Sequence, residues 1–166
     1  MNKFLLLGPS GVGKSSASKI IKLKNNSIIV YDLDEVIKEH EHVNSISNYF
    51  TEIGNEEFFN KSKDIIENYK SDSTILFVIG AGSIDYSLGH KWYRDQNTIS
   101  ITGDPSIIFE RGNRNCFHSS LEDYIRIEFS SERVELYNNA KYIIDVSNMS
   151  EQQVANEIMS VIINNK

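Results

Sequence analysis

A glycine-rich segment near the start of the chain has the residue types and spacing of a phosphate-binding loop. Residues 8–15 read Gly-Pro-Ser-Gly-Val-Gly-Lys-Ser and match the pattern G-x-x-x-x-G-K-[ST]. Glycines at these positions let successive backbone N–H groups turn inward around phosphate oxygens, and the following helix adds its positive N-terminal end. Lys14 would reach the β- and γ-phosphates, and the Ser15 hydroxyl would ligate Mg²⁺. We therefore predict a nucleotide site built from Gly8, Gly11, Val12, Gly13, Lys14, Ser15 and Ser16, the alternative being a plain glycine-rich turn.

Two aspartates, Asp32 and Asp34, lie at the end of a second apolar run. They are two residues apart, so in a strand their side chains point to the same side. A magnesium nucleotide needs a carboxylate near its metal, and a hydroxyl nucleophile needs an acceptor that aligns it and takes its proton. We assign Asp32 to the metal and Asp34 to the hydroxyl. The alternative is that Asp34 only caps a helix beginning at Glu35.

A second turn of small residues, Gly80-Ala81-Gly82, follows the most continuous apolar run of the chain. Small residues there allow backbone N–H groups to approach a bound substrate closely. The alternative is a tight strand-to-helix turn, which needs glycine for its backbone conformation. The sequence therefore predicts a place for a second substrate at 80–82.

Short apolar runs that read as strands position these groups. They cover residues 3–7, 27–32, 74–79, 98–102 and 142–146. Helical patterns lie after Lys14, over 34–69, from Pro105, from Ser120 toward Ala140, and after a capping box at Ser150 and Gln153. This alternation favours a parallel sheet covered by helices on both faces, with ligands at the carboxyl ends of the strands. The phosphate loop, the aspartates and the glycine turn all follow strands, so we expect them at one edge.

Composition limits the class of protein. The chain has 166 residues, 40% of them hydrophobic, and a net charge of −6, which predicts one globular domain over 1–166 and argues against nucleic-acid or membrane partners. Its single cysteine, Cys116, excludes an internal disulfide and a multi-cysteine zinc site. His40 and His42 would lie on different faces of a helix, which disfavours a metal site there. The N-terminus lacks the pattern of a signal peptide, so we expect a cytoplasmic monomer.

Together these features resemble the shikimate kinase family, small kinases of the nucleoside-monophosphate-kinase-like P-loop class. The resemblance covers nearly the whole chain and includes the phosphate loop, the Asp-x-Asp pair, the glycine turn, Arg111 and Arg114 around a lid, and Glu-Arg-Val-Glu-Leu-Tyr at 132–137. It implies a three-layer α/β fold with a five-stranded parallel sheet of order 2-3-1-4-5, a short lid at about 112–119 and substrate-side helices at about 34–69. It also implies that Arg111 packs on adenine, that Arg114 stabilises the transferring phosphoryl group, and that Arg133 holds a substrate carboxylate.

Two positions depart from the pattern of that family. Residues 54–59 line up with its Gly-Glu-x-x-Phe-Arg segment, so Phe59 stands where an arginine would anchor the substrate carboxylate, and Ala81 replaces the middle glycine of the turn. Losing a bidentate guanidinium removes a charge-assisted contact of about 1.5–3 kcal/mol. We expect Phe59→Arg to improve shikimate affinity, the alternative for Phe59 being a place in the core. The expected substrate-side residues are Asp34, Phe59, Gly80, Ala81, Gly82 and Arg133.

The resulting hypothesis is a kinase that transfers the γ-phosphoryl group of Mg·ATP to a hydroxyl of a small acidic metabolite. Lys14, Asp34 and Arg114 would be catalytic, and Ser15 and Asp32 would serve the metal. Shikimate is the first acceptor to try, and a polyol acid such as gluconate is another. Two further classes stay open: a degenerate kinase acting as a nucleotide-binding switch, and a structural adaptor that binds no Mg·ATP.

Overall fold

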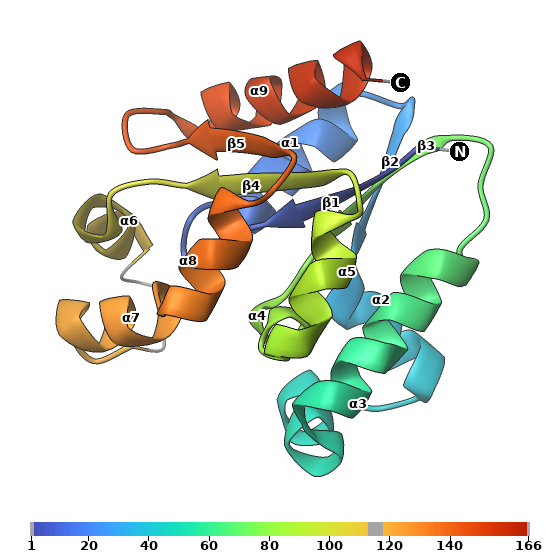
Figure 1. Cartoon of the computed structure of the whole chain (residues 1–166). Coiled ribbons are helices and arrows are strands. Elements are labelled where there is room, and N and C mark those ends of the chain that lie inside the picture. Colours follow the sequence, from blue (N-terminus) through green and yellow to red (C-terminus); the bar gives the residue numbers. More distant parts are fainter. Residues whose placement is uncertain (1, 113–117, 166) are drawn as a thin grey trace.

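The computed structural model describes residues 2–112 and 118–165, and these residues contain a five-stranded parallel sheet (Figure 1). The strands are β1 (Lys3–Leu7), β2 (Ile28–Asp32), β3 (Thr74–Val78), β4 (Thr98–Thr102) and β5 (Tyr142–Asp145). Their order across the sheet is β2-β3-β1-β4-β5, and every neighbouring pair is parallel. Leu5 of the central strand lies opposite Phe77 of β3 and Thr98 of β4. The expected fold class and strand order are confirmed.

Helices cover both faces of the sheet and give the three layers (Figure 1). One face carries α1 (Lys14–Lys24), α6 (Pro105–Gly112), α7 (Leu121–Glu128) and α9 (Glu151–Asn164). The other carries α2 (Leu33–Glu41), α3 (Ile46–Asn68), α4 (Ala81–Ile84), the 3₁₀ turn η1 (Ser87–Gly89), α5 (His90–Arg94) and α8 (Ser131–Asn138). The crossover connections therefore bury β1 from both sides.

The alternation of side chains along β1 divides the core between these faces. Phe4 and Leu6 belong to the cluster that includes α1 and α9, whereas Leu5 and Leu7 belong to the cluster that includes α2, α3 and α8. All four are at most 1% exposed. Burial of both faces explains why this strand is apolar at all four of these positions. It also anchors the phosphate loop, which begins where the strand ends.

Two expected helices are each divided in the structure. The region 34–69 forms α2 and α3, because His42 ends α2 in a left-handed conformation (φ 55°), and α3 itself kinks at Gly54 (φ 77°). The helix expected from residue 120 toward 140 forms α7 and α8, which are separated by residues 129–130. The second break brings Glu128, at the end of α7, against Arg133 of α8.

The segment between β3 and β4 holds α4, η1 and α5, for which the sequence pattern predicts no helix. These elements span three to five residues each, which is too short for an apolar period to appear. The expected lid at 112–119 falls mostly on residues 113–117, which lie outside the described residues. In the part of the chain that the structure describes, no helix is long and apolar enough to cross a membrane.

Candidate functional site

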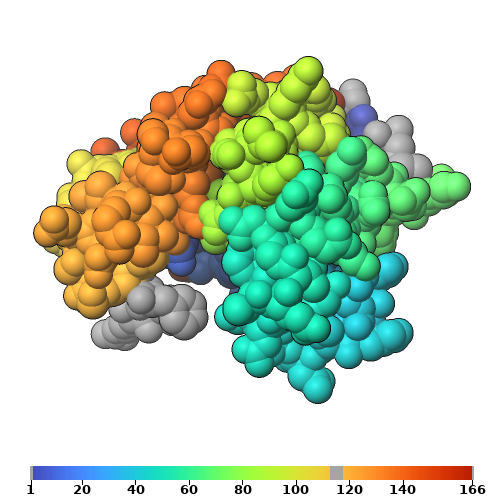
Figure 2. Space-filling model, turned by 60° about the horizontal axis from the view of Figure 1, so that its bottom comes forward, coloured from blue at the N-terminus to red at the C-terminus, as the bar shows by residue number. Residues whose placement is uncertain are grey.

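A cavity of about 460 Å³ surrounds the phosphate loop. Figure 2 looks into a hollow between the orange surface of α7 and α8 and the teal surface of α3, with the blue surface of the first residues at its floor. The cavity is lined by Ser10, Gly11, Val12, Gly13, Lys14, Ser15, Ser16, Asp34, Gly80, Ala81, Arg111, Gly112, Glu151 and Val154. It thus brings together most of the predicted nucleotide residues. Gly8 contributes its carbonyl to the same loop, and Arg114 lies outside the described residues.

The backbone of the loop has a positive φ at three glycines, and Gly8 and Gly13 show two different reasons for this requirement. Gly8 (φ 151°) lies so close to β4 that a Cβ atom would overlap the carbonyl oxygen of Ile101. Gly13 (φ 105°) is left-handed and directly precedes α1. The loop therefore passes close to the sheet at one end and turns sharply into the helix at the other, so that the N–H groups of the first turn of α1 face the cavity.

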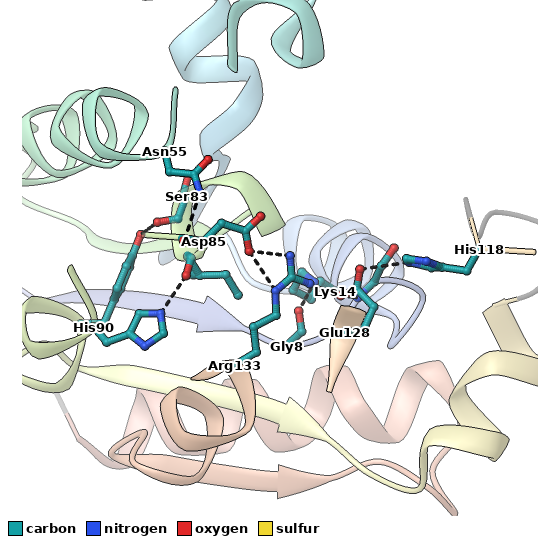
Figure 3. Close-up of polar contacts among 12 residues, drawn as sticks. Gly8, Lys14, Asn55, Ser83, Asp85, His90, His118, Glu128 and Arg133 are labelled. Atoms are coloured by element: carbon teal, nitrogen blue, oxygen red, sulfur yellow. Dashed lines mark hydrogen bonds and ion pairs between the residues drawn. The ribbon is translucent and has the colours of Figure 1, made fainter. Parts of the chain in front are cut away.

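Lys14, the first residue of α1, turns its side chain back over the loop (Figure 3). Its Nζ donates hydrogen bonds to the carbonyl oxygens of Gly8 (2.6 Å) and Pro9 (3.0 Å). Burial lowers the pKa of Lys14 to about 8, although Glu128 and Asp34 favour its charged form. The ammonium is therefore fixed by the backbone of the loop, at the edge of the first cavity.

The tip of the loop is fixed from the opposite side by α7. Glu128 accepts a hydrogen bond from the Ser10 N–H (2.9 Å), and the Tyr124 hydroxyl donates to the Ser10 carbonyl (2.7 Å). The backbone N–H and carbonyl groups of Ser10 are thereby both held by side chains that lie one helical turn apart on α7. The sequence pattern did not identify Tyr124 and Glu128 as residues that hold the loop. Their sign in the sequence is a glutamate four residues after a tyrosine, a spacing that places both side chains on one face of a helix.

Asp34 borders two cavities, because it lines the phosphate-loop cavity and a second one of about 210 Å³. A Cβ atom on Gly80 would overlap the carboxylate oxygens of Asp34, so the glycine gives this carboxylate its place. Gly80 is therefore needed for its close contact with the side chain of Asp34, and it also directly precedes α4. Ala81 begins that short helix, as the tight-turn alternative requires, and lines the first cavity.

The environment of Asp34 favours its protonated form. Burial, and after it the nearby charge of Asp32, raise the pKa of Asp34 to about 6, while Lys14 acts in the opposite direction. Asp32 is the residue that caps α2, accepting a hydrogen bond from the Asp34 N–H (3.1 Å). The helix begins at Leu33, so Asp34 does not cap it. The carboxylate of Asp34 instead borders the two cavities.

The second cavity has a mixed lining. It is formed by Asp34, Ile46, Ser47, Phe50, Phe58, Gly82 and Asp85. Gly82 contributes by its small size, since a Cβ atom there would lie 3.1 Å from the ring of Phe50. The cavity therefore combines two carboxylates, a hydroxyl and two aromatic rings, and one of these carboxylates, Asp34, also lines the first cavity.

Arg133 is buried between two carboxylates (Figure 3). Its Nη1 donates to Glu128 (2.7 Å), and its Nε and Nη2 both donate to Oδ1 of Asp85 (2.9 and 2.6 Å). Burial alone would lower the pKa of Arg133, but Glu128 and Asp85 raise it above its usual value. Burial would raise the pKa of Glu128, yet Arg133 and the Ser10 N–H hold it below its usual value. Both groups are therefore charged at neutral pH, and the role of Asp85 went unnoticed in the sequence.

The structure does not bring Phe59 to either cavity, contrary to its expected place on the substrate side. Phe59 is 5% exposed, and its ring packs against Tyr86, Trp92 and Tyr93 at centroid distances of 5.6–5.9 Å. This core position is the alternative that the sequence left open. By contrast Arg111 does border the first cavity, where its guanidinium donates to the backbone carbonyls of Val146 and Ser147.

Comparison with known proteins identifies the family of this chain. The family model for shikimate kinase matches residues 10–163. A shikimate kinase from Thermodesulfovibrio yellowstonii is 24% identical over 172 residues, covering 96% of this chain and 94% of that protein. The crystal structure of shikimate kinase from Bacteroides thetaiotaomicron has a similar fold (TM-score 0.73, 19% identity, 96% of each chain). A gluconokinase from Sinorhizobium meliloti also has a similar fold (TM-score 0.55, 13% identity, 98% of this chain and 92% of that one). With a family model that spans almost its full length, the chain belongs to the shikimate kinase family.

Proposed function

We propose that this protein transfers the γ-phosphoryl group of Mg·ATP to a hydroxyl group of a small metabolite. The observation that carries the proposal is the position of Asp34, whose carboxylate borders both the phosphate-loop cavity and the second cavity. A group in that position can accept the proton of an acceptor hydroxyl on one side while the hydroxyl oxygen faces the γ-phosphate on the other. A carboxylate with a pKa of about 6 is ionised at pH 7 yet basic enough to take a proton as the bond forms.

Lys14 and the loop supply the charge that the transferring group requires. The Lys14 ammonium and the N–H groups at the start of α1 are preorganised around the first cavity. Such fixed donors stabilise developing negative charge more than water does, because they need no reorganisation. In this proposal Lys14 and Arg114 neutralise the phosphoryl oxygens, Arg111 packs on the adenine, and Asp34 orients the acceptor.

The residues of the site fit a magnesium ion that enters with the nucleotide. Ser15 lines the first cavity with a hydroxyl, and Asp32 uses Oδ1 for the cap of α2, with Oδ2 making no hydrogen bond within the described residues. Oxygen donors of this kind suit Mg²⁺, which keeps several waters. No group of three or more His, Cys, Asp or Glu side chains among the described residues would hold a metal alone. Ser15 and Asp32 would therefore hold an ion that, when bound, neutralises the phosphate oxygens.

The proposal predicts ADP release that depends on both an acceptor and Lys14. In a coupled assay over a panel of hydroxyl metabolites including shikimate and gluconate, at least one acceptor should stimulate ADP release. Lys14→Ala should lower that rate about 10²–10³-fold, because it removes a preorganised cation. Tight ATP binding without stimulation by any acceptor would instead support a nucleotide-binding switch, and absence of Mg·ATP binding in a thermal-shift measurement would support a structural adaptor.

The pH dependence of kcat/KM should differ between the acceptor and ATP, because Asp34 serves the acceptor and Lys14 serves ATP. The pKa of Asp34 is raised to about 6, so kcat/KM for the acceptor should fall as the pH drops through 6 and the base becomes protonated. The pKa of Lys14 is lowered to about 8, so kcat/KM for ATP should fall as the pH rises through 8 and the ammonium loses its charge. Initial rates from pH 5 to 9, with the second substrate saturating, measure both limbs. A kcat/KM for the acceptor that is flat between pH 5 and 7 would contradict the role of Asp34.

A further inference from the structure

Glu128, the last residue of α7, is a buried carboxylate that contacts three separate segments of the chain (Figure 3). Its Oε2 atom accepts a hydrogen bond from the Ser10 N–H in the phosphate loop (2.9 Å) and another from Nη1 of Arg133 in α8 (2.7 Å). Its Oε1 atom lies 3.2 Å from Nε2 of His118. A carboxylate that is 4% exposed and has partners on both oxygens has a fixed position, so it can in turn fix the groups that it binds.

Arg133 holds Glu128 in place from the side of α8. Arg133 is itself held by Asp85, whose Oδ1 accepts hydrogen bonds from Nε and Nη2. The bonds to Asp85 and Glu128 use three of the five N–H donors of the guanidinium, and Arg133 also lines a further cavity of about 340 Å³. The expected role of Arg133 toward a substrate carboxylate is therefore compatible with its contact to Glu128.

The base and the tip of the phosphate loop are held by different groups. Lys14 holds the base through the carbonyl oxygens of Gly8 and Pro9. Its ammonium has three N–H donors, so it can give a phosphate more than one of them only by releasing a carbonyl. The two hydrogen bonds to Ser10 come from α7 and use no group that the proposed reaction assigns to ATP. The position of the tip in the nucleotide-bound protein therefore depends on α7 rather than on Lys14.

The tip itself, Ser10 and Gly11, lines the first cavity and is packed against the end of α6. Gly11 has a left-handed conformation (φ 76°), and a Cβ atom on Gly112 would lie 2.9 Å from its Cα atom. Packing against α6 and hydrogen bonds to α7 thus set the conformation of the tip before a ligand arrives. A loop that is already ordered avoids the loss of conformational entropy that binding would otherwise impose on it.

We infer that Glu128 is a positioning residue of the nucleotide site, which keeps the tip of the phosphate loop in its binding conformation through the Ser10 N–H. The inference rests on the proposed binding of Mg·ATP and extends it to a residue outside the lining of the first cavity. The alternative is that Glu128 only pairs with Arg133 and stabilises the fold. Loss of a purely structural ion pair lowers the melting temperature and leaves the nucleotide Kd of the folded protein unchanged, whereas loss of positioning raises that Kd.

The test is calorimetry of Mg·ADP binding at pH 6.5 to the wild type, Glu128→Ala and Glu128→Gln, with a thermal melt of each protein. Glu128→Ala leaves the Ser10 N–H without its carboxylate and should raise the Kd for Mg·ADP about tenfold. Glu128→Gln should stay within about threefold of the wild type. The reason is that the donors of Ser10 and Arg133 share Oε2, so a single amide oxygen can accept from both.

Glu122→Ala is the matched control, since it removes a glutamate from the same helix. Glu122 is exposed, lies outside the lining of the first cavity and, within the described residues, makes no hydrogen bond or ion pair with Ser10 or Arg133. Its replacement should leave the Kd for Mg·ADP unchanged. If Glu128→Ala does not fold, as judged by its thermal melt, Glu128→Met fills the same space without a carboxylate and should give the same tenfold increase.

Two results would overturn the inference. One is a variant without the carboxylate that melts at a lower temperature but binds Mg·ADP with the Kd of the wild type. The other is a Glu128→Gln protein that is weakened as much as Glu128→Ala, which would make the charge responsible rather than the hydrogen bond to the loop. Neither measurement needs an acceptor. A wild type that binds no Mg·ADP would refute the proposed function itself, whereas equal binding by the wild type and the variants would refute only the role of Glu128.

Discussion

Replacing Asp34 by Asn is expected to lower kcat about 10²–10⁴-fold and at the same time to stabilise the protein above pH 6. The loss of rate follows from removing the base, because an amide cannot take the proton of the acceptor. The gain in stability follows from burial, which raises the pKa of Asp34 from 3.8 to about 6. A buried carboxylate that must ionise at neutral pH costs folding free energy, and an isosteric amide does not.

The sign and pH range of this gain can be stated. The folded state binds the Asp34 proton more tightly than the unfolded state, so the penalty is absent below pH 3.8, grows between 3.8 and 6, and is complete above pH 6. Its full size is about 2–3 kcal/mol, which for a chain of this length corresponds to a rise in Tm of about 4–12 °C. Thermal melts should therefore show the variant above the wild type at pH 8 and close to it at pH 4.

Asp32→Asn is the control, since it removes the same charge two residues away. Asp32 caps α2 through the Asp34 N–H, and its charge is only the second cause of the raised pKa of Asp34, after burial, so its replacement should give a smaller gain in Tm. If Asp34→Asn retained wild-type turnover on every acceptor, Asp34 would not be the base. If its Tm were unchanged at both pH values, the burial of its charge would be of no energetic consequence.

Phe59→Arg is expected to destabilise the fold by about 3–5 kcal/mol rather than to restore a substrate contact. The ring of Phe59 packs among Tyr86, Trp92 and Tyr93, and a Cβ atom on Gly89 would lie 2.6 Å from it. A guanidinium there would be buried in an aromatic cluster without a carboxylate partner within the described residues. This reverses the expectation drawn from the sequence, that the arginine would improve shikimate affinity.

Urea unfolding of Phe59→Arg against Phe59→Leu measures the effect. The leucine variant keeps an apolar side chain and should lose much less, about 1–2 kcal/mol. An arginine variant that unfolds at the wild-type urea midpoint and binds shikimate more tightly would show that the side chain reaches the acceptor side, contrary to the packing described above.

The parts of this protein that could be predicted from sequence are those whose determinants are local. The phosphate loop is a contiguous pattern after an apolar strand, and the capping box at Ser150 and Gln153 forms as expected. The long helical region was only partly predicted, because the left-handed residue that ends α2 is His42, which carries no glycine or proline signal. The short helices between β3 and β4 carry too few residues for a period.

The acceptor side could not be predicted because its contacts join distant parts of the chain. Arg133 and Asp85 are 48 positions apart, and Ser10 and Glu128 are 118 positions apart. A sequence pattern identifies an arginine that can hold a carboxylate, but only the packing of α4 against α8 decides whose carboxylate it holds. The same applies to Phe59, whose neighbours come from η1 and α5.

The two hydrogen bonds to Ser10 bear on the point in the synthesis of the chain at which the phosphate loop becomes able to bind a nucleotide. Ser10 is synthesised before both of its partners, because Tyr124 follows 114 positions later and Glu128 later still. At about 5–20 residues per second the loop waits roughly 6–25 s for these partners. β1 likewise needs β3 and β4 before both of its edges are paired. A nucleotide therefore has a complete binding loop only after α7 has been made, and its binding energy is added to the stability of the whole fold rather than to an intermediate formed before α7.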